Sequence, residues 1–183
     1  YTMMARQILL SLFFLLLITS GAFAQFCPPN IDFETGSTAY WQYFRGSVSV
    51  GPVYSFVSCP PKMGLHTLMS GTDTDYYGGF PIVGGGSYSL KLGHDTTNNN
   101  ADRARYNVHV PSGSSVYDLM YRYAVVFQDG PGHSATQQPR MEIKAYDSSS
   151  GALIACDSFC YAMASGLLGF IPSTVKSDVY YLP

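Results

Sequence analysis

The sequence predicts an all-β fold of the sandwich or jelly-roll type, and three observations support this prediction. Short segments in which apolar and polar residues alternate recur along the chain, and turn clusters separate them. No segment carries a sustained apolar stripe at the i, i+3, i+4, i+7 spacing of a helix. Gly, Ser, Thr, Asn and Tyr are abundant, whereas stretches rich in the helix formers Ala, Leu, Glu and Lys are missing.

Alternation also predicts the individual strands. Trp41 is assigned to the core of the first strand, because large aromatic side chains dominate core burial. The longest candidate is 116–128, and one of its faces is assigned to the core: Tyr117, Leu119, Tyr121, Tyr123, Val125 and Phe127. Other strands are expected at residues 88–92, 104–110, 140–147 and 153–155, with weaker signals at 47–50 and 65–69. Residues 179–182 have the pattern of a further strand.

The N-terminal segment has the three parts of a secretory signal peptide. Arg6 supplies a positive charge, residues 8–18 are apolar, and residues 22–24 (AFA) have the pattern of a cleavage site. The apolar run is shorter than the roughly 20 residues of a membrane-spanning helix. We therefore expect residues 1–24 to be removed and no membrane span to remain.

Residues 25–183 are predicted to form one domain, secreted or held at the extracellular cell surface. Their length corresponds to about one domain, and no internal repeat divides them.

Two residues precede Met3 and Met4, either of which is the expected natural start. The 10 basic and 12 acidic residues nearly balance and form no basic run, so nucleic acid is not an expected partner.

All four cysteines lie in the segment expected to be exported, where disulfides are the default. Four cysteines allow three connectivities, and the sequence does not select one. Cys156 and Cys160 could close a small loop, which would leave Cys27 to pair with Cys59. The spacing lacks the C-x-x-C pairs of a zinc site.

The loop 71–79 (GTDTDYYGG) is the best candidate for a ligand site. A tyrosine ring offers a flat apolar face to the C–H groups of a sugar, and neighbouring carboxylates accept hydrogen bonds from its hydroxyls. Tyr76 and Tyr77 lie beside Asp73 and Asp75 in this loop. The alternative is that both tyrosines pack on the sandwich with their hydroxyls at its rim.

Nothing in the sequence predicts an enzyme. No G-x-S-x-G nucleophile motif occurs, and the carboxylates form no recognisable pair. The glycines 84–86 lack the lysine and the helix of a phosphate loop. The histidines are scattered and unaccompanied, as expected of loop or surface residues: His66, His94, His109 and His133.

Six stretches of the chain share their sequence and their order with one known family. They are residues 27–36 (CPPNIDFETG), 76–81 (YYGGFP), 88–93 (YSLKLG), 121–129 (YRYAVVFQD), 138–143 (QPRMEI) and 155–159 (ACDSF). On these stretches the chain resembles the N-terminal module of Bacteroidetes surface proteins. Those proteins are gliding-motility-associated or adhesin-like chains, often with PKD-type repeats and a C-terminal type IX secretion signal.

The resemblance implies a jelly-roll β-sandwich akin to carbohydrate-binding and galactose-binding-like modules. In the family, further strands follow the position of Tyr181, so we expect the domain to be incomplete at its C-terminus. In related jelly rolls, one early and one late acidic residue hold a structural Ca²⁺. Glu34 matches the early position, and calcium is the one cofactor suggested.

These observations predict a non-catalytic extracellular binding or adhesion module of a larger secreted, adhesin-like protein. The expected partners are a glycan or surface polymer and the downstream domains of the same chain. The alternative is a structural stalk or cap domain that has no ligand of its own.

Overall fold

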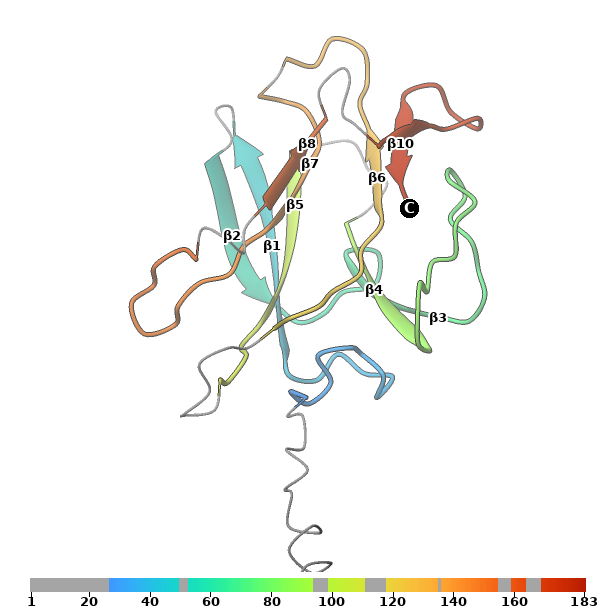
Figure 1. The fold of residues 1–183 in the computed structure, drawn as a ribbon. Helices are drawn as coiled ribbons and strands as arrows, with labels where there is room; N and C mark the ends of the chain where they lie inside the picture. The colour runs from blue at the N-terminus through green and yellow to red at the C-terminus, as the bar shows by residue number, and fades with distance from the viewer. Residues whose placement is uncertain are drawn as a thin grey trace, which may run out of the picture.

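The computed structural model describes residues 27–49, 53–93, 99–110, 118–134, 136–154, 159–163 and 169–183. These residues form ten β-strands and no helix (Figure 1). The expected signal peptide, the residues 116 and 117, His94 and Cys156 lie outside the described residues. In the described part of the chain, no helix has the length and apolar character needed to cross a membrane.

The strands pair antiparallel in four sheets, and this confirms the expected all-β class with the sheets of a β-sandwich. One sheet has the order β2-β1-β5, formed by β2 (Val53–Cys59), β1 (Trp41–Ser49) and β5 (Asn100–Tyr106). A second has the order β6-β10-β9, formed by β6 (Val125–Gln128), β10 (Val179–Leu182) and β9 (Ile171–Pro172). Two further pairs are β3 (His66–Ser70) with β4 (Tyr88–Leu92), and β7 (Arg140–Ile143) with β8 (Phe159–Ala162).

Strand β1 is central in its sheet, and its alternate residues make contacts on opposite faces. On one face the Tyr43 side chain is only 2% exposed, and its ring lies 4.9 Å from that of His66 in β3. On the other face Phe44 lies beneath the guanidinium of Arg105, at 5.1 Å from the ring centre. The guanidinium of Arg103 lies 3.8 Å from the ring centre of Phe56 on β2. These cation–π contacts place the guanidinium groups of two arginines of β5 over aromatic rings of β1 and β2.

The β7–β8 pair is joined to this sheet through Tyr54. Its hydroxyl donates a 2.9 Å hydrogen bond to Oε1 of Glu142, and Nζ of Lys144 lies 2.6 Å from Oε2. Burial, with a smaller effect of Glu142, raises the pKa of Tyr54 to about 12. Partial burial acts to raise the pKa of Glu142, but the hydrogen bonds from Lys144 and Tyr54 hold it below its usual value. Glu142 is therefore a charged acceptor between the two elements.

The principal hydrophobic core lies between the β6-β10-β9 sheet and the β7–β8 pair. Its buried members are Val125 and Phe127 of β6 and Met163. The rings of Phe127 and Phe170 stack with 5.4 Å between their centres. Partly buried side chains surround them: Met141, Tyr161, Phe170, Tyr180 and Leu182. Each fully buried side chain of this size contributes about 1.5–3 kcal/mol.

Two expected strands are confirmed with their bounds, Tyr88–Leu92 as β4 and Val179–Leu182 as β10. Strand β10 lies between β6 and β9, both of which precede it in the chain, and pairs with both.

The prediction of a long strand over 116–128 is wrong, because only Val125–Gln128 is a strand among the described residues 118–128. Of the side chains assigned to the core face, Val125 and Phe127 are buried, whereas Leu119 and Tyr121 are 53% and 42% exposed. The four residues of β10 pair with the four residues of β6, so no partner continues the ladder before Val125.

Other strand bounds are also corrected. The strand expected at 104–110 is Asn100–Tyr106, because Tyr106 pairs with Trp41, where β1 begins. The weak signals at 47–50 and 65–69 belong to β1 and to β3. In 140–147, the strand ends at Ile143. Of the strand expected at 153–155, the described residues 153 and 154 form only an isolated bridge, between Leu153 and Tyr146.

Candidate functional site

The predicted ligand loop is a hydrogen-bonded hairpin. Its two arms are joined by the bridge between Thr74 and Pro81 and by a 2.9 Å bond from the Ile82 N–H to the Asp73 carbonyl. At its tip, the Gly79 N–H donates to the Asp75 carbonyl at 2.8 Å. Gly79 has a φ of 67°, a conformation that glycine adopts without steric cost. The arms and the tip together fix the direction of the side chains between them.

The side chain of Asp75 stabilises this turn from within. Its Oδ1 accepts hydrogen bonds from the N–H groups of Tyr77 at 2.9 Å and Gly78 at 2.8 Å. An aspartate that bonds to the backbone two or three residues later holds a turn in place. Asp75 therefore positions the tip, and one of its two oxygens is already used.

The hairpin rests on the β6-β10-β9 sheet. The buried hydroxyl of Ser173 donates a 2.7 Å hydrogen bond to the carbonyl oxygen of Tyr77. The rings of Phe80 and Tyr181 lie 5.9 Å apart, so the second arm packs against β10. Gly78 lies so close to both rings that a Cβ atom there would overlap them. The loop 71–79 is polar in sequence, but these contacts fix one side of it to the sheet.

Tyr76 is the side chain that the hairpin presents to solvent. It is 73% exposed, and its ring stands edge-on to that of Tyr77, with 5.2 Å between centres. Asp73, on the first arm, is also exposed. Of the four residues predicted to bind ligand, the structure gives Asp75 and Tyr77 contacts inside the hairpin and leaves Tyr76 and Asp73 accessible.

Glu34, the residue expected to bind calcium, is engaged by backbone groups. Its two oxygens each accept a 2.9 Å hydrogen bond from the Ser87 N–H, and Oε1 accepts another from Tyr88 at 3.2 Å. Gly86, with a φ of 77°, leaves room for the carboxylate. In the described ranges no group of three or more His, Cys, Asp or Glu side chains gathers as a metal site. Glu34 alone is too few ligands for calcium, which takes about six to eight oxygens.

The expected pairing of Cys27 with Cys59 is not formed, since both are free thiols, as is Cys160. The sheet order explains this result. The segment that begins at Cys27 is tied to β5, because the Tyr106 hydroxyl donates to the Pro29 carbonyl at 2.7 Å. Cys59 ends β2, on the opposite side of β1. A disulfide requires the two Cα atoms to lie roughly 4.4–6.8 Å apart.

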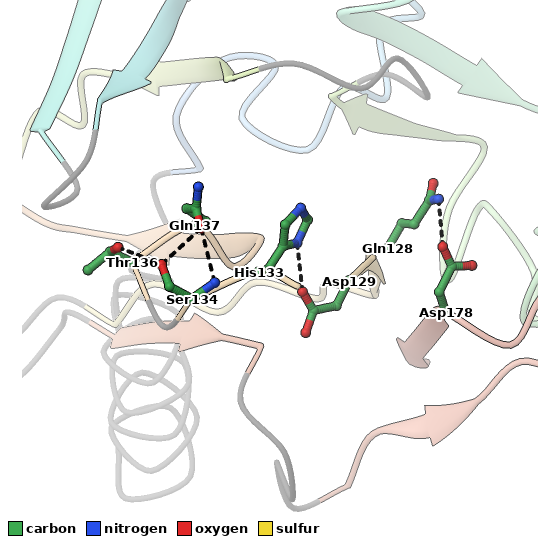
Figure 2. Close-up of polar contacts among 7 residues, drawn as sticks. All are labelled: Gln128, Asp129, His133, Ser134, Thr136, Gln137 and Asp178. Carbon is green, nitrogen blue, oxygen red and sulfur yellow. Dashed lines mark hydrogen bonds and ion pairs between the residues drawn. The ribbon is translucent and has the colours of Figure 1, made fainter. Parts of the chain in front are cut away.

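Two histidines differ from the expectation of unaccompanied surface residues. His66 is buried, and its Nε2 lies 3.1 Å from the Phe44 carbonyl oxygen. His133 Nδ1 lies 2.9 Å from Oδ1 of Asp129, and Figure 2 shows the imidazole ring above that carboxylate. The sequence analysis did not identify the pair of Asp129 and His133, although the two residues are four positions apart in the sequence.

The neighbouring hydroxyl does not complete a catalytic arrangement with this pair. Ser134 Oγ donates to Oε1 of Gln137 at 2.9 Å and lies 3.0 Å from Oγ1 of Thr136. Figure 2 shows this cluster beside the histidine and separate from it. A nucleophilic serine would have to be hydrogen-bonded to the histidine base. In this part of the chain the serine stabilises its own loop.

Sequence reasoning also missed a shallow cavity at the other end of the molecule. Its lining combines the prolines that follow Cys27 with the end of β5 and the residues after it: Pro28, Pro29, Tyr40, Tyr106, Asn107 and His109. These positions are far apart in the sequence, and the pairing of β1 with β5 and the bond from the Tyr106 hydroxyl to the Pro29 carbonyl bring them together.

Comparisons with protein-family models, with curated proteins and with solved structures find no match to this chain.

Proposed function

We propose that this chain is a non-catalytic, extracellular binding module that recognises a glycan through Tyr76. The observation that carries the proposal is a tyrosine ring that is 73% exposed on a hairpin held by backbone, Asp75 and Ser173 hydrogen bonds. An exposed aromatic ring on a fixed turn loses little conformational freedom when a ligand stacks on it.

The hairpin supplies both kinds of contact that a sugar requires. The face of Tyr76 offers apolar contact to the C–H groups of a pyranose ring. The exposed carboxylate of Asp73 and the second oxygen of Asp75 accept hydrogen bonds from hydroxyls. Carbohydrate-binding modules of the jelly-roll type are the proposed relatives, and the proposed setting is a secreted, adhesin-like surface protein.

A glycan array followed by titration tests this proposal. We expect saturable binding by the wild-type protein and at least tenfold weaker binding by Tyr76→Ala, equivalent to about 1.4 kcal/mol. Asp73→Asn should weaken binding less, because the amide oxygen still accepts a hydrogen bond. Tyr146→Ala is the matched control, since Tyr146 is also exposed but lies on another turn.

Two results would overturn the assignment. Absence of saturable binding to any glycan would favour the stalk or cap domain, which has no ligand. Equal weakening by Tyr76→Ala and Tyr146→Ala would place the binding surface elsewhere.

A further inference from the structure

The cavity beside β5 has the size and walls of a small ligand site. Its volume is about 320 Å³, near the lower end of the roughly 300–1,000 Å³ of known ligand pockets. Two tyrosine rings and two prolines make its surface mostly apolar, and Asn107 and His109 add polar groups at the side. None of the described residues that line it is Asp, Glu, Lys or Arg.

The wall formed by the first residues is held by a network around Asn30. This side chain is buried, and its Nδ2 donates to the carbonyls of Ser37 and Ala39, each at 3.0 Å. Its Oδ1 accepts from the Thr35 hydroxyl at 2.6 Å. The carbonyl of Ala39 is therefore fixed immediately before Tyr40, and this wall exists without a ligand.

The floor is fixed by aromatic contacts and by the hydroxyl of Tyr106. Trp41 stacks on Phe33 at 4.7 Å, meets the edge of Tyr106 at 5.1 Å and donates from Nε1 to the Asn30 carbonyl at 3.0 Å. The Tyr106 hydroxyl is bonded to Pro29, so its ring cannot turn away from the cavity. Side chains locked in this way form a preorganised surface.

Tyr40 is held in an unfavourable backbone conformation at the mouth of this cavity. Its φ is 71°, which is rare for a bulky residue. Its side chain is 66% exposed, so burial does not compensate for the strain. Strained residues of this kind concentrate at ligand sites, where the surrounding structure imposes the conformation. The result is an aromatic ring directed to the solvent beside an apolar hollow.

We propose that this cavity is a second binding site, which takes an uncharged pyranose ring between Tyr40 and Tyr106. The ring face of Tyr40 stacks on the sugar, and the amide of Asn107 and the imidazole of His109 bond to its hydroxyls. The lining residues that the structure describes include no cationic side chain that would attract an anionic sugar. The site rests on the proposed glycan-binding function but uses none of the residues of the Tyr76 hairpin.

The test is a titration of the purified full chain with methyl glycosides of glucose, galactose and mannose, and with glucuronate, followed by NMR of the backbone and side-chain amides. We expect at least one neutral glycoside to shift the Asn107 and His109 signals in a saturable way, with glucuronate binding more weakly. Tyr40→Gly should reduce this affinity at least tenfold. Glycine adopts a positive φ freely, so this variant should keep or raise the melting temperature, which separates loss of the ring from loss of the fold.

The controls separate this site from the hairpin. Tyr76→Ala should leave the shifts at Asn107 and His109 unchanged, and Tyr40→Gly should leave glycan-array binding through Tyr76 detectable. Failure of the Tyr76 assignment would therefore not remove the signal at Asn107. The second site is overturned if no neutral glycoside shifts these signals, if Tyr40→Gly binds as wild type does, or if glucuronate binds more tightly than the neutral sugars.

Discussion

The hydroxyl of Ser173 donates a 2.7 Å hydrogen bond to the carbonyl oxygen of Tyr77 and so joins two segments that lie 96 residues apart. Ser173 is 8% exposed and also accepts a bond from the Val175 N–H at 3.1 Å. This hydrogen bond joins the hairpin of Tyr76 to the segment that follows β9. We therefore expect the position of Tyr76 to depend on a buried residue outside the proposed ligand contacts.

Ser173→Ala should destabilise the protein and weaken binding at the hairpin. Removal of the donor leaves the Tyr77 carbonyl without its partner, at a cost of about 1–3 kcal/mol. We expect a lower midpoint in urea and weaker glycan binding, although Tyr76 itself is intact. Ser177→Ala is the control, because Ser177 is exposed on the turn before β10. Equal stability of the two variants would contradict this role of Ser173.

Gly46→Ala should disrupt the pairing of β1 with β2. A Cβ atom at Gly46 would overlap the carbonyl oxygen of Ser55 and lie 2.8 Å from the Phe56 ring. We expect a loss of about 1–3 kcal/mol, as for other overpacked positions, measured by thermal and urea unfolding. Gly84→Ala provides the comparison, since a Cβ there meets no atom within 4 Å. A wild-type melting temperature for Gly46→Ala would show that the strands separate easily at this point.

Tyr54→Phe should loosen the contact between β2 and β7. The lost hydrogen bond goes to a charged carboxylate, and at this partly exposed position we expect a cost of about 1–2 kcal/mol. In a double-mutant cycle with Glu142→Gln, the two changes should be non-additive, because each removes part of the same interaction. Strict additivity of the unfolding free energies would show that the bond contributes nothing.

Asp147 should titrate at unusually low pH. Hydrogen bonds from the Ser149 hydroxyl and N–H and from the Ser150 hydroxyl hold the pKa of Asp147 at about 2, below its ordinary 3.8. Because the folded-state pKa is depressed, its stabilising contribution is complete above about pH 4 and is lost as the pH falls through about 2.

Carboxyl-carbon NMR checks this value directly. Ser149→Ala should move the midpoint of Asp147 upward, whereas Ser148→Ala, next to it in the same turn, should not. A midpoint near the ordinary value in the wild-type protein would show that the turn does not form in solution.

The sequence was sufficient to predict the all-β class and the bounds of β4 and β10, because these strands carry the alternation of a half-buried sheet. It was insufficient for β2, where Val53 and Val57 are more than 60% exposed while Tyr54 and Phe56 pack against the sheet. Apolar residues on both faces conceal the alternation.

The error at 116–128 has the opposite cause, since the alternation is clear but none of the described strands extends the β6 ladder before Val125. Pairing is a property of the whole fold and cannot be read from one segment. The candidate sites also differ in whether a local sequence pattern reveals them or only the whole fold does. The aromatic and acidic composition of 71–79 marked Tyr76 and Asp73, whereas the Tyr40 cavity depends on distant residues and on a backbone angle that no local pattern reveals.

The sheet orders also bear on how this chain reaches its folded state. The β1–β2, β3–β4 and β9–β10 pairs join consecutive strands, whereas β5 pairs with β1, and β10 with β6, over much longer separations in the sequence. Such non-local pairings raise the contact order, and β-rich domains of this kind fold in milliseconds to seconds. We therefore expect β1–β2 to form early and the pairing of β10 with β6 to be among the last steps. Until β10 pairs with β6, the surface on which the Tyr76 hairpin rests is not assembled, so this binding surface should appear only at the end of folding.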